Sequence, residues 1–110
     1  MAKKCGRHTG AFLLLFLTEG SFYGAELLSK LQTELPHCFT ESSDVYRSLQ
    51  EIEQEGLAET FWDIEASGQP RKIYTITPLG KQALKEHSED IQMRLENFQY
   101  FLNHYKETGE

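Results

Sequence analysis

The distribution of hydrophobic residues predicts two helices in the first third of the chain. Residues 9–18 are apolar on every side, which is typical of a helix buried in a core, and Gly20 ends this stretch. Residues 24–35 place leucines at intervals of three and four, with polar residues such as Lys30 on the other side. This spacing predicts an amphipathic second helix. We expect it to end at Pro36, because proline lacks an N–H group and disfavours helical backbone in the preceding residue.

A third helical pattern follows a short polar stretch. Val45, Leu49 and Ile52 recur at helical spacing, and the Ser-Ser-Asp sequence at residues 42–44 supplies candidate N-cap residues. Gly56 stands where a left-handed C-terminal cap would lie. Two helices of about three turns each, joined by a short polar turn, predict a helix-turn-helix.

The next pattern changes from helical to extended. Residues 57–64 and 71–77 are rich in β-branched and aromatic side chains, and residues 66–70 between them contain Gly and Pro. We therefore expect a β-hairpin after the three helices. This order predicts a mainly α fold with a small β-hairpin, a winged helix-turn-helix.

The C-terminal segment predicts a long helix that packs against another helix. Thr77 is a candidate N-cap and Pro78 suits the first helical position. Apolar residues then follow a seven-residue repeat, and we name this set the seam: Leu84, Ile91, Leu95, Phe98, Leu102 and Tyr105. Because a chain of 110 residues with this fold has no internal partner of that length, we predict a homodimer. Residues 1–80 would form the winged helix-turn-helix and residues 81–110 the dimerisation helix of one compact unit.

The charge of the chain disfavours nucleic-acid binding at first sight. The formal net charge is −6, and residues 24–56 hold seven acids and two bases. On a helical wheel of the third helix, however, the face opposite the apolar residues holds Ser43, Arg47, Gln50 and Gln54. The acids of this helix fall on its flanks, so the outward face remains compatible with a DNA groove.

The residue types on this face suit the major groove. An arginine can donate to guanine and a glutamine can pair with adenine, whereas serine and lysine reach phosphates. We expect helix 44–55 to read bases and wing 65–72 to contact the backbone. The candidate DNA-binding residues are Ser42, Ser43, Tyr46, Arg47, Gln50, Gln54, Arg71, Lys72, Lys3 and Lys4. A solvated polar surface explains the same pattern, and Tyr46 could simply pack beside the core.

Several segments together resemble a known family. They are Tyr-Gly-Ala-Glu-Leu at residues 23–27, Val-Tyr-Arg-Ser-Leu at 45–49, Ile-Glu-Gln-Glu-Gly-Leu at 52–57, and the wing at 67–80. Over residues 11–84 the chain resembles the PadR-like bacterial transcriptional regulators, in the short form with one C-terminal dimerisation helix. The resemblance implies a dimeric winged-helix repressor, in some members released by a small aromatic or cationic effector.

A second interpretation belongs to another class of protein. Two segments depart from the family pattern: residues 41–44 replace a Ser-Pro-Gly-Thr-like sequence, and Gln50-Glu51 replaces an arginine pair. A winged-helix protein-interaction module that has lost DNA binding would use its acidic face to bind a protein partner. Replacement of Arg47 and Arg71 would discriminate between the two functions.

The sequence offers no catalytic or metal centre. It contains no nucleophile and base pair or Gly-rich phosphate loop, and its four histidines are scattered, so we expect no enzyme, metal or cofactor. Cys38 is either a redox-sensitive thiol beside the turn or a semi-buried core residue.

The aromatic residues suggest an additional ligand. Phe98, Tyr100, Phe101 and Tyr105, with two phenylalanines of the first helix, predict a dimer core that could hold a small aromatic effector.

Residues 11–17 follow basic residues as in a signal peptide, but this run is too short to span a bilayer and no cleavage site follows. We therefore expect a cytoplasmic protein without membrane contact.

Overall fold

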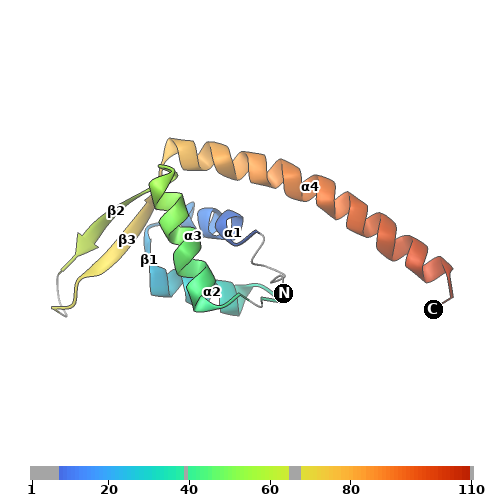
Figure 1. Ribbon diagram of the computed structural model, residues 1–110, viewed down its shortest axis with the longest axis horizontal. Helices are drawn as coiled ribbons and strands as arrows, with labels where there is room; N and C mark the ends of the chain where they lie inside the picture. The colour runs from blue at the N-terminus through green and yellow to red at the C-terminus, as the bar shows by residue number, and fades with distance from the viewer. Residues whose placement is uncertain (1–7, 39, 65–67, 110) are drawn as a thin grey trace.

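The computed structural model describes residues 8–38, 40–64 and 68–109, in which four helices accompany a three-stranded sheet (Figure 1). The molecule is elongated, with extents of 60 × 26 × 24 Å, because its last helix extends away from the remaining elements. Lys3, Lys4 and residues 65–67 of the wing lie outside the described residues. The predictions of DNA contact at these positions are therefore not tested.

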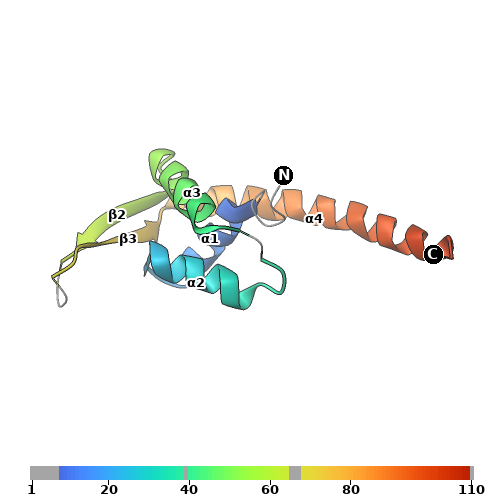
Figure 2. The ribbon, with the colours of Figure 1, turned by 60° about the horizontal axis from the view of Figure 1, so that its bottom comes forward.

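The core lies among the first three helices, α1 (Thr9–Leu17), α2 (Gly24–Glu34) and α3 (Ser42–Gln54). Figure 2 shows α1 enclosed between the other elements, and its contacts extend to α2, α3 and the last helix. The fully buried aliphatic side chains come from all three helices and are Leu13, Leu14, Leu27, Leu31, Val45 and Leu49. The prediction that α1 is buried on every side is wrong at Leu15, which is 46% exposed because no element covers that side.

The second helix ends as predicted, but its lysine is not on a solvated face. Leu35 has extended backbone directly before Pro36. The Lys30 ammonium lies 3.2 Å from Glu19 and 3.0 Å from Glu34, and 5.3 Å from the centre of the Phe16 ring. Its aliphatic stem therefore covers apolar surface while its charge is paired, and hydrogen bonds to Glu34 and then Glu19 raise the pKa of Lys30.

The N-cap of the third helix lies one residue before the predicted N-cap cluster. Its N-cap is Glu41, whose carbonyl accepts from the backbone N–H groups of Asp44 (3.0 Å) and Val45 (3.2 Å). Ser42 and Ser43 are thus the first helical residues and not the cap, which corrects the prediction. Their side chains are exposed on the first turn. Gly56 has the positive φ of 77° that the predicted C-terminal cap requires.

The hairpin is confirmed and gains a third strand. β2 (Ala58–Asp63) and β3 (Arg71–Ile76) pair antiparallel, and β1 (Phe22–Tyr23) adds to the other edge of β3. We did not predict β1, because two residues are too few for an alternating pattern. Its pairing joins the start of α2 to the wing.

The last helix, α4 (Pro78–Glu107), begins as predicted. The Thr77 hydroxyl accepts from the Gly80 backbone N–H at 3.0 Å, and Pro78 is the first helical residue. Its first turns pack against the other elements: Leu84 lies against the chain's own core, so this residue serves intramolecular packing. Farther along, the seam is exposed, with Phe98 63% accessible.

Candidate nucleic-acid interface

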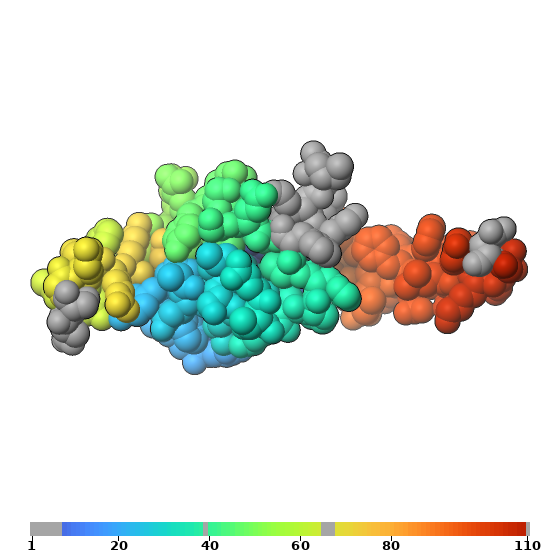
Figure 3. Space-filling model, turned by 90° about the horizontal axis from the view of Figure 1, so that it is seen from below, coloured from blue at the N-terminus to red at the C-terminus, as the bar shows by residue number. Residues whose placement is uncertain are grey.

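The outward face of α3 is polar and accessible. Val45, Leu49 and Ile52 are buried, whereas Ser43, Arg47, Gln50 and Gln54 are exposed, so the described structure has the two faces that the helical wheel gave. Figure 3 shows α2 and α3 side by side, with the wing at one end of this surface and α4 at the other. The third helix is therefore open to a large partner that approaches from this side.

Arg47 extends from the middle of this face. Its side chain is 64% exposed, and one guanidinium nitrogen lies 3.2 Å from the Asp44 carboxylate one turn earlier. An exposed pair at this spacing contributes about 0.3–0.5 kcal/mol. The contact thus orients the arginine weakly and leaves most of its planar group open to a ligand.

The ring of Tyr46, which belongs to α3, lies against the start of α2. A Cβ atom at Gly24 would approach the Tyr46 ring to 2.6 Å, so the glycine permits this ring to cover the first turn of α2. Beside it a hollow of about 400 Å³ opens between α2, α3 and β3, lined by Tyr23, Gly24, Ala25, Tyr46, Arg71, Lys72 and Tyr74. Arg71 and the N-terminus of α2 together favour an anion in this hollow.

Arg71 is placed by the aromatic residue that precedes α2. Its guanidinium carbon lies 4.8 Å from the centre of the Tyr23 ring, and the Tyr23 hydroxyl donates to Asp63 at 3.1 Å. The side chain of Arg71 is exposed. A cation over an aromatic face keeps its charge available at the edge of the wing.

The half-buried Lys72 is directed toward α3. Its ammonium lies 2.6 Å from a carboxylate oxygen of Glu53, and the other oxygen accepts from the Thr60 hydroxyl at 2.9 Å. The hydrogen bond from Lys72, followed by that from Thr60, lowers the pKa of Glu53, and the same contact with Glu53 raises the pKa of Lys72. The sequence did not predict this pair, because the two residues are 19 positions apart and adjoin only through the packing of α3 against the sheet.

Comparison with known protein families identifies the family to which this chain belongs. Residues 13–86 match the sequence model of the transcriptional regulator PadR-like family, which is more than half of the chain. The chain belongs to the PadR-like family of transcriptional regulators. Members of this family are transcriptional regulators and not enzymes.

Solved structures of PadR-like proteins share this fold. A PadR family regulator from hypervirulent Clostridium difficile superposes with a TM-score of 0.74 at 21% identity, over 86% of this chain and 98% of that chain. A PadR-like regulator from Bacillus cereus gives 0.70 at 26% identity, over 84% and 89%. PadR of Bacillus subtilis, solved in complex with operator DNA, gives 0.65 at 27% identity, over 70% of this chain and 44% of that chain. No curated protein sequence matches the chain significantly.

The distal half of α4 of this PadR-like protein carries exposed rings. Tyr100 stacks on His104 with ring centres 3.9 Å apart, and Phe101 lies 6.3 Å from Tyr105. These residues line a shallow hollow of about 540 Å³. Phe16, which we expected to join them around an effector, is instead buried in the core of its own chain.

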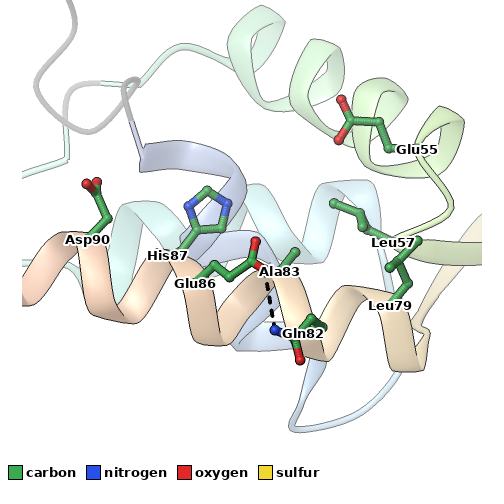
Figure 4. A pocket seen from close by; sticks show the side chains of 8 residues that line it. All are labelled: Glu55, Leu57, Leu79, Gln82, Ala83, Glu86, His87 and Asp90. Atoms are coloured by element: carbon green, nitrogen blue, oxygen red, sulfur yellow. Dashed lines mark hydrogen bonds between the residues drawn. The ribbon is translucent and has the colours of Figure 1, made fainter.

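A third hollow lies between the end of α3 and the start of α4 (Figure 4). Its volume is about 470 Å³, and its lining includes Glu55, Glu86, His87 and Asp90. Glu86 accepts from Gln82, as the dashed line marks. Within residues 8–38, 40–64 and 68–109, no group of three potential ligands could hold a metal ion.

Two remaining predictions concern the thiol and the membrane. Cys38 is half-buried against the core, as its semi-buried interpretation requires, and its redox role is not tested. In the part of the chain that the structure describes, no helix has both the length and the apolar character to cross a bilayer.

Proposed function

We propose that this PadR-like protein is a homodimeric transcriptional repressor of the cytoplasm that reads operator DNA with α3 and the adjacent wing. The single observation that carries the proposal is the exposed stripe of Ser43, Arg47, Gln50 and Gln54, flanked by Arg71 on the wing. The complex of Bacillus subtilis PadR with operator DNA supports it, because that protein has the same fold and 27% identity.

The chemistry of each contact follows from the side chains on this face. Arg47 would donate to guanine O6 and N7, Gln50 would pair with adenine, and Gln54 would reach the next base or phosphate. Ser42 and Ser43, on the first turn of α3, and Tyr46 would contact phosphates. The acids on the flanks repel the DNA backbone, so we expect weak non-specific binding, and the contacts of the basic residues with phosphates make the affinity fall as salt rises.

The seam on α4 supports the homodimer. Leu95, Phe98, Leu102 and Tyr105 are each at least half exposed in the single chain. Such a series of large apolar residues along one helix is typical of a surface that another helix covers. A two-fold dimer would present two copies of α3 to a palindromic operator, and an aromatic effector bound among these rings would change their spacing.

Fluorescence anisotropy tests the regulator function directly. The protein is titrated into labelled DNA from upstream of its own gene and into scrambled DNA of equal length, at low and high salt. We expect preference for the upstream DNA and an affinity that falls as salt rises. Absence of both the preference and the salt dependence would contradict DNA binding.

Replacement of Arg47 tests base reading. We expect Arg47→Ala to weaken operator binding by about 1–3 kcal/mol and to relax the preference at one base pair, whereas Arg71→Ala should weaken binding to all sequences. Arg94→Ala on α4, which removes an equal charge from an Asp90 pair, serves as the matched control and should leave binding unchanged. Equal losses for Arg47→Ala on operator and scrambled DNA would contradict base reading.

The single tryptophan provides an internal probe of the wing. Trp62 is exposed on β2, directly opposite Lys72 in the sheet. We expect operator DNA to shift or quench its emission, because the wing would lie against the sugar-phosphate backbone. Scrambled DNA at high salt is the control, and an emission unchanged at saturating operator would contradict a wing contact.

The acidic residues beside α3 favour one alternative function. Glu51 and Glu55 are exposed next to the outward stripe and could meet a basic protein surface. In that case Arg47→Ala and Arg71→Ala would leave partner binding intact, and the wild-type protein would show no DNA binding to lose.

A further inference from the structure

Three side chains join the outward-facing helix to both long strands of the wing. Glu53 comes from α3, Thr60 from β2 and Lys72 from β3, with contacts of 2.6 Å for Glu53–Lys72 and 2.9 Å for Glu53–Thr60. Glu53 and Lys72 are each 33% exposed. The Lys72 ammonium also lies 5.8 Å from the Tyr74 ring centre and 6.0 Å from that of Trp62.

These contacts lie near the outer end of the hairpin, where they restrain its orientation. Lys72 pairs with Trp62, one step before Asp63 and Arg71, the outermost pair of the ladder. An isolated two-stranded hairpin is marginally stable in water. A contact near the outer end therefore restrains the angle of the wing more than a contact at its base would.

We propose that Glu53 and Lys72 form a lock that fixes the wing relative to α3, and that Lys72 is a positioning residue and not a phosphate contact. The proposal rests on the DNA-binding function above. A lysine that binds phosphate must direct its ammonium toward the DNA, whereas here the ammonium contacts the Glu53 carboxylate and lies over the rings of Trp62 and Tyr74. The acid next to the DNA surface then serves binding by holding α3 and the wing in one geometry.

Two variants and their combination test the lock in DNA binding. We expect Glu53→Gln and Lys72→Met each to weaken operator binding about threefold to fivefold, because each breaks one partly exposed ion pair. The double variant should be no weaker than either single one, since both remove the same contact. The salt dependence of Lys72→Met should equal that of the wild type.

A direct phosphate contact at Lys72 predicts a different result. Lys72→Met would then lower the slope of log affinity against log salt by about one, and Glu53→Gln would tighten binding by releasing the lysine. Either result would overturn the lock. Glu55→Gln removes the same charge from the same helix, so the effect of Glu53→Gln is measured relative to it.

A measurement without DNA separates the lock from the proposed function. Trp62 is the only tryptophan, and the Lys72 ammonium lies 6.0 Å from the centre of its ring, so its emission reports where Lys72 lies. We expect Glu53→Gln to change this emission and Glu55→Gln to leave it unchanged. If the wild type binds no DNA, the regulator function fails, and the emission alone then decides the lock: an unchanged Glu53→Gln spectrum overturns it.

Discussion

Gly80→Ala is expected to destabilise the protein by about 3 kcal/mol, although alanine favours helices. Gly80 is buried in the first turn of α4, and a methyl group there would overlap the carbonyl oxygen of Leu57 and lie 2.8 Å from a side-chain carbon of Ile76. The Leu57 carbonyl also accepts from the backbone N–H of Thr77 at 3.1 Å, so it cannot move aside without losing that bond. The melting temperature should fall by roughly 10–20 °C.

Gly10→Ala is the matched control for this substitution. Gly10 lies in the first turn of α1, and an added Cβ would meet no atom of the described residues within 4 Å. We expect this variant to be neutral or to gain up to about 1 kcal/mol. Both are compared with the wild type by thermal unfolding at one protein concentration, because the melting temperature of the proposed dimer would depend on concentration. Equal stabilities of the two variants would contradict the close packing at Gly80.

The second large effect is expected at the seam. Leu95→Glu combined with Leu102→Glu should convert the dimer to a monomer, because each leucine would be buried between two α4 helices and a charge could not be. Loss of about 2 kcal/mol of burial at each of the substituted sites, which occur in both protomers, raises the dimer dissociation constant by roughly five to six orders of magnitude. Operator affinity should fall with it, since two copies of α3 would no longer bind as one unit.

Analytical ultracentrifugation measures the first effect and anisotropy the second. Met93→Glu is the control, because Met93 is an exposed apolar residue on the opposite side of α4 from Leu95 and Leu102. We expect it to leave the dimer and operator binding intact. A Leu95→Glu/Leu102→Glu variant that sediments as the wild type would remove the seam from the dimer interface.

The order of elements could be predicted from sequence because each has a strong local signal. The leucine spacing in α2, the apolar triplet of α3 and Thr77-Pro78 before α4 depend on neighbours within a few residues. The predictions were wrong where the signal is short or absent: β1 has two residues, and the N-cap of α3 is Glu41, which is not a preferred cap residue.

The candidate site likewise contains residues whose exposure could be predicted from sequence and residues whose placement could not. The exposure of Arg47 and Gln50 follows from helical periodicity alone, since burial of Val45 and Leu49 determines the opposite face. The placement of Lys72 does not, because its direction depends on how α3 lies over the sheet. Lys72 and Arg71 are adjacent basic residues in sequence, yet the alternation of a strand directs one toward Glu53 and the other toward Tyr23.

The helices, the hairpin, the polar outward stripe and the family resemblance follow from the sequence alone, because they depend on residue type and local spacing. The contacts between residues far apart in sequence follow only from the packing of the folded elements. Glu53 meets Lys72, Lys30 meets Glu19, and Gly80 meets the Leu57 carbonyl through packing between elements. The physical reason is that a side-chain contact needs placement within a few ångströms, which residues far apart in sequence achieve only once the core has fixed the relative positions of their elements.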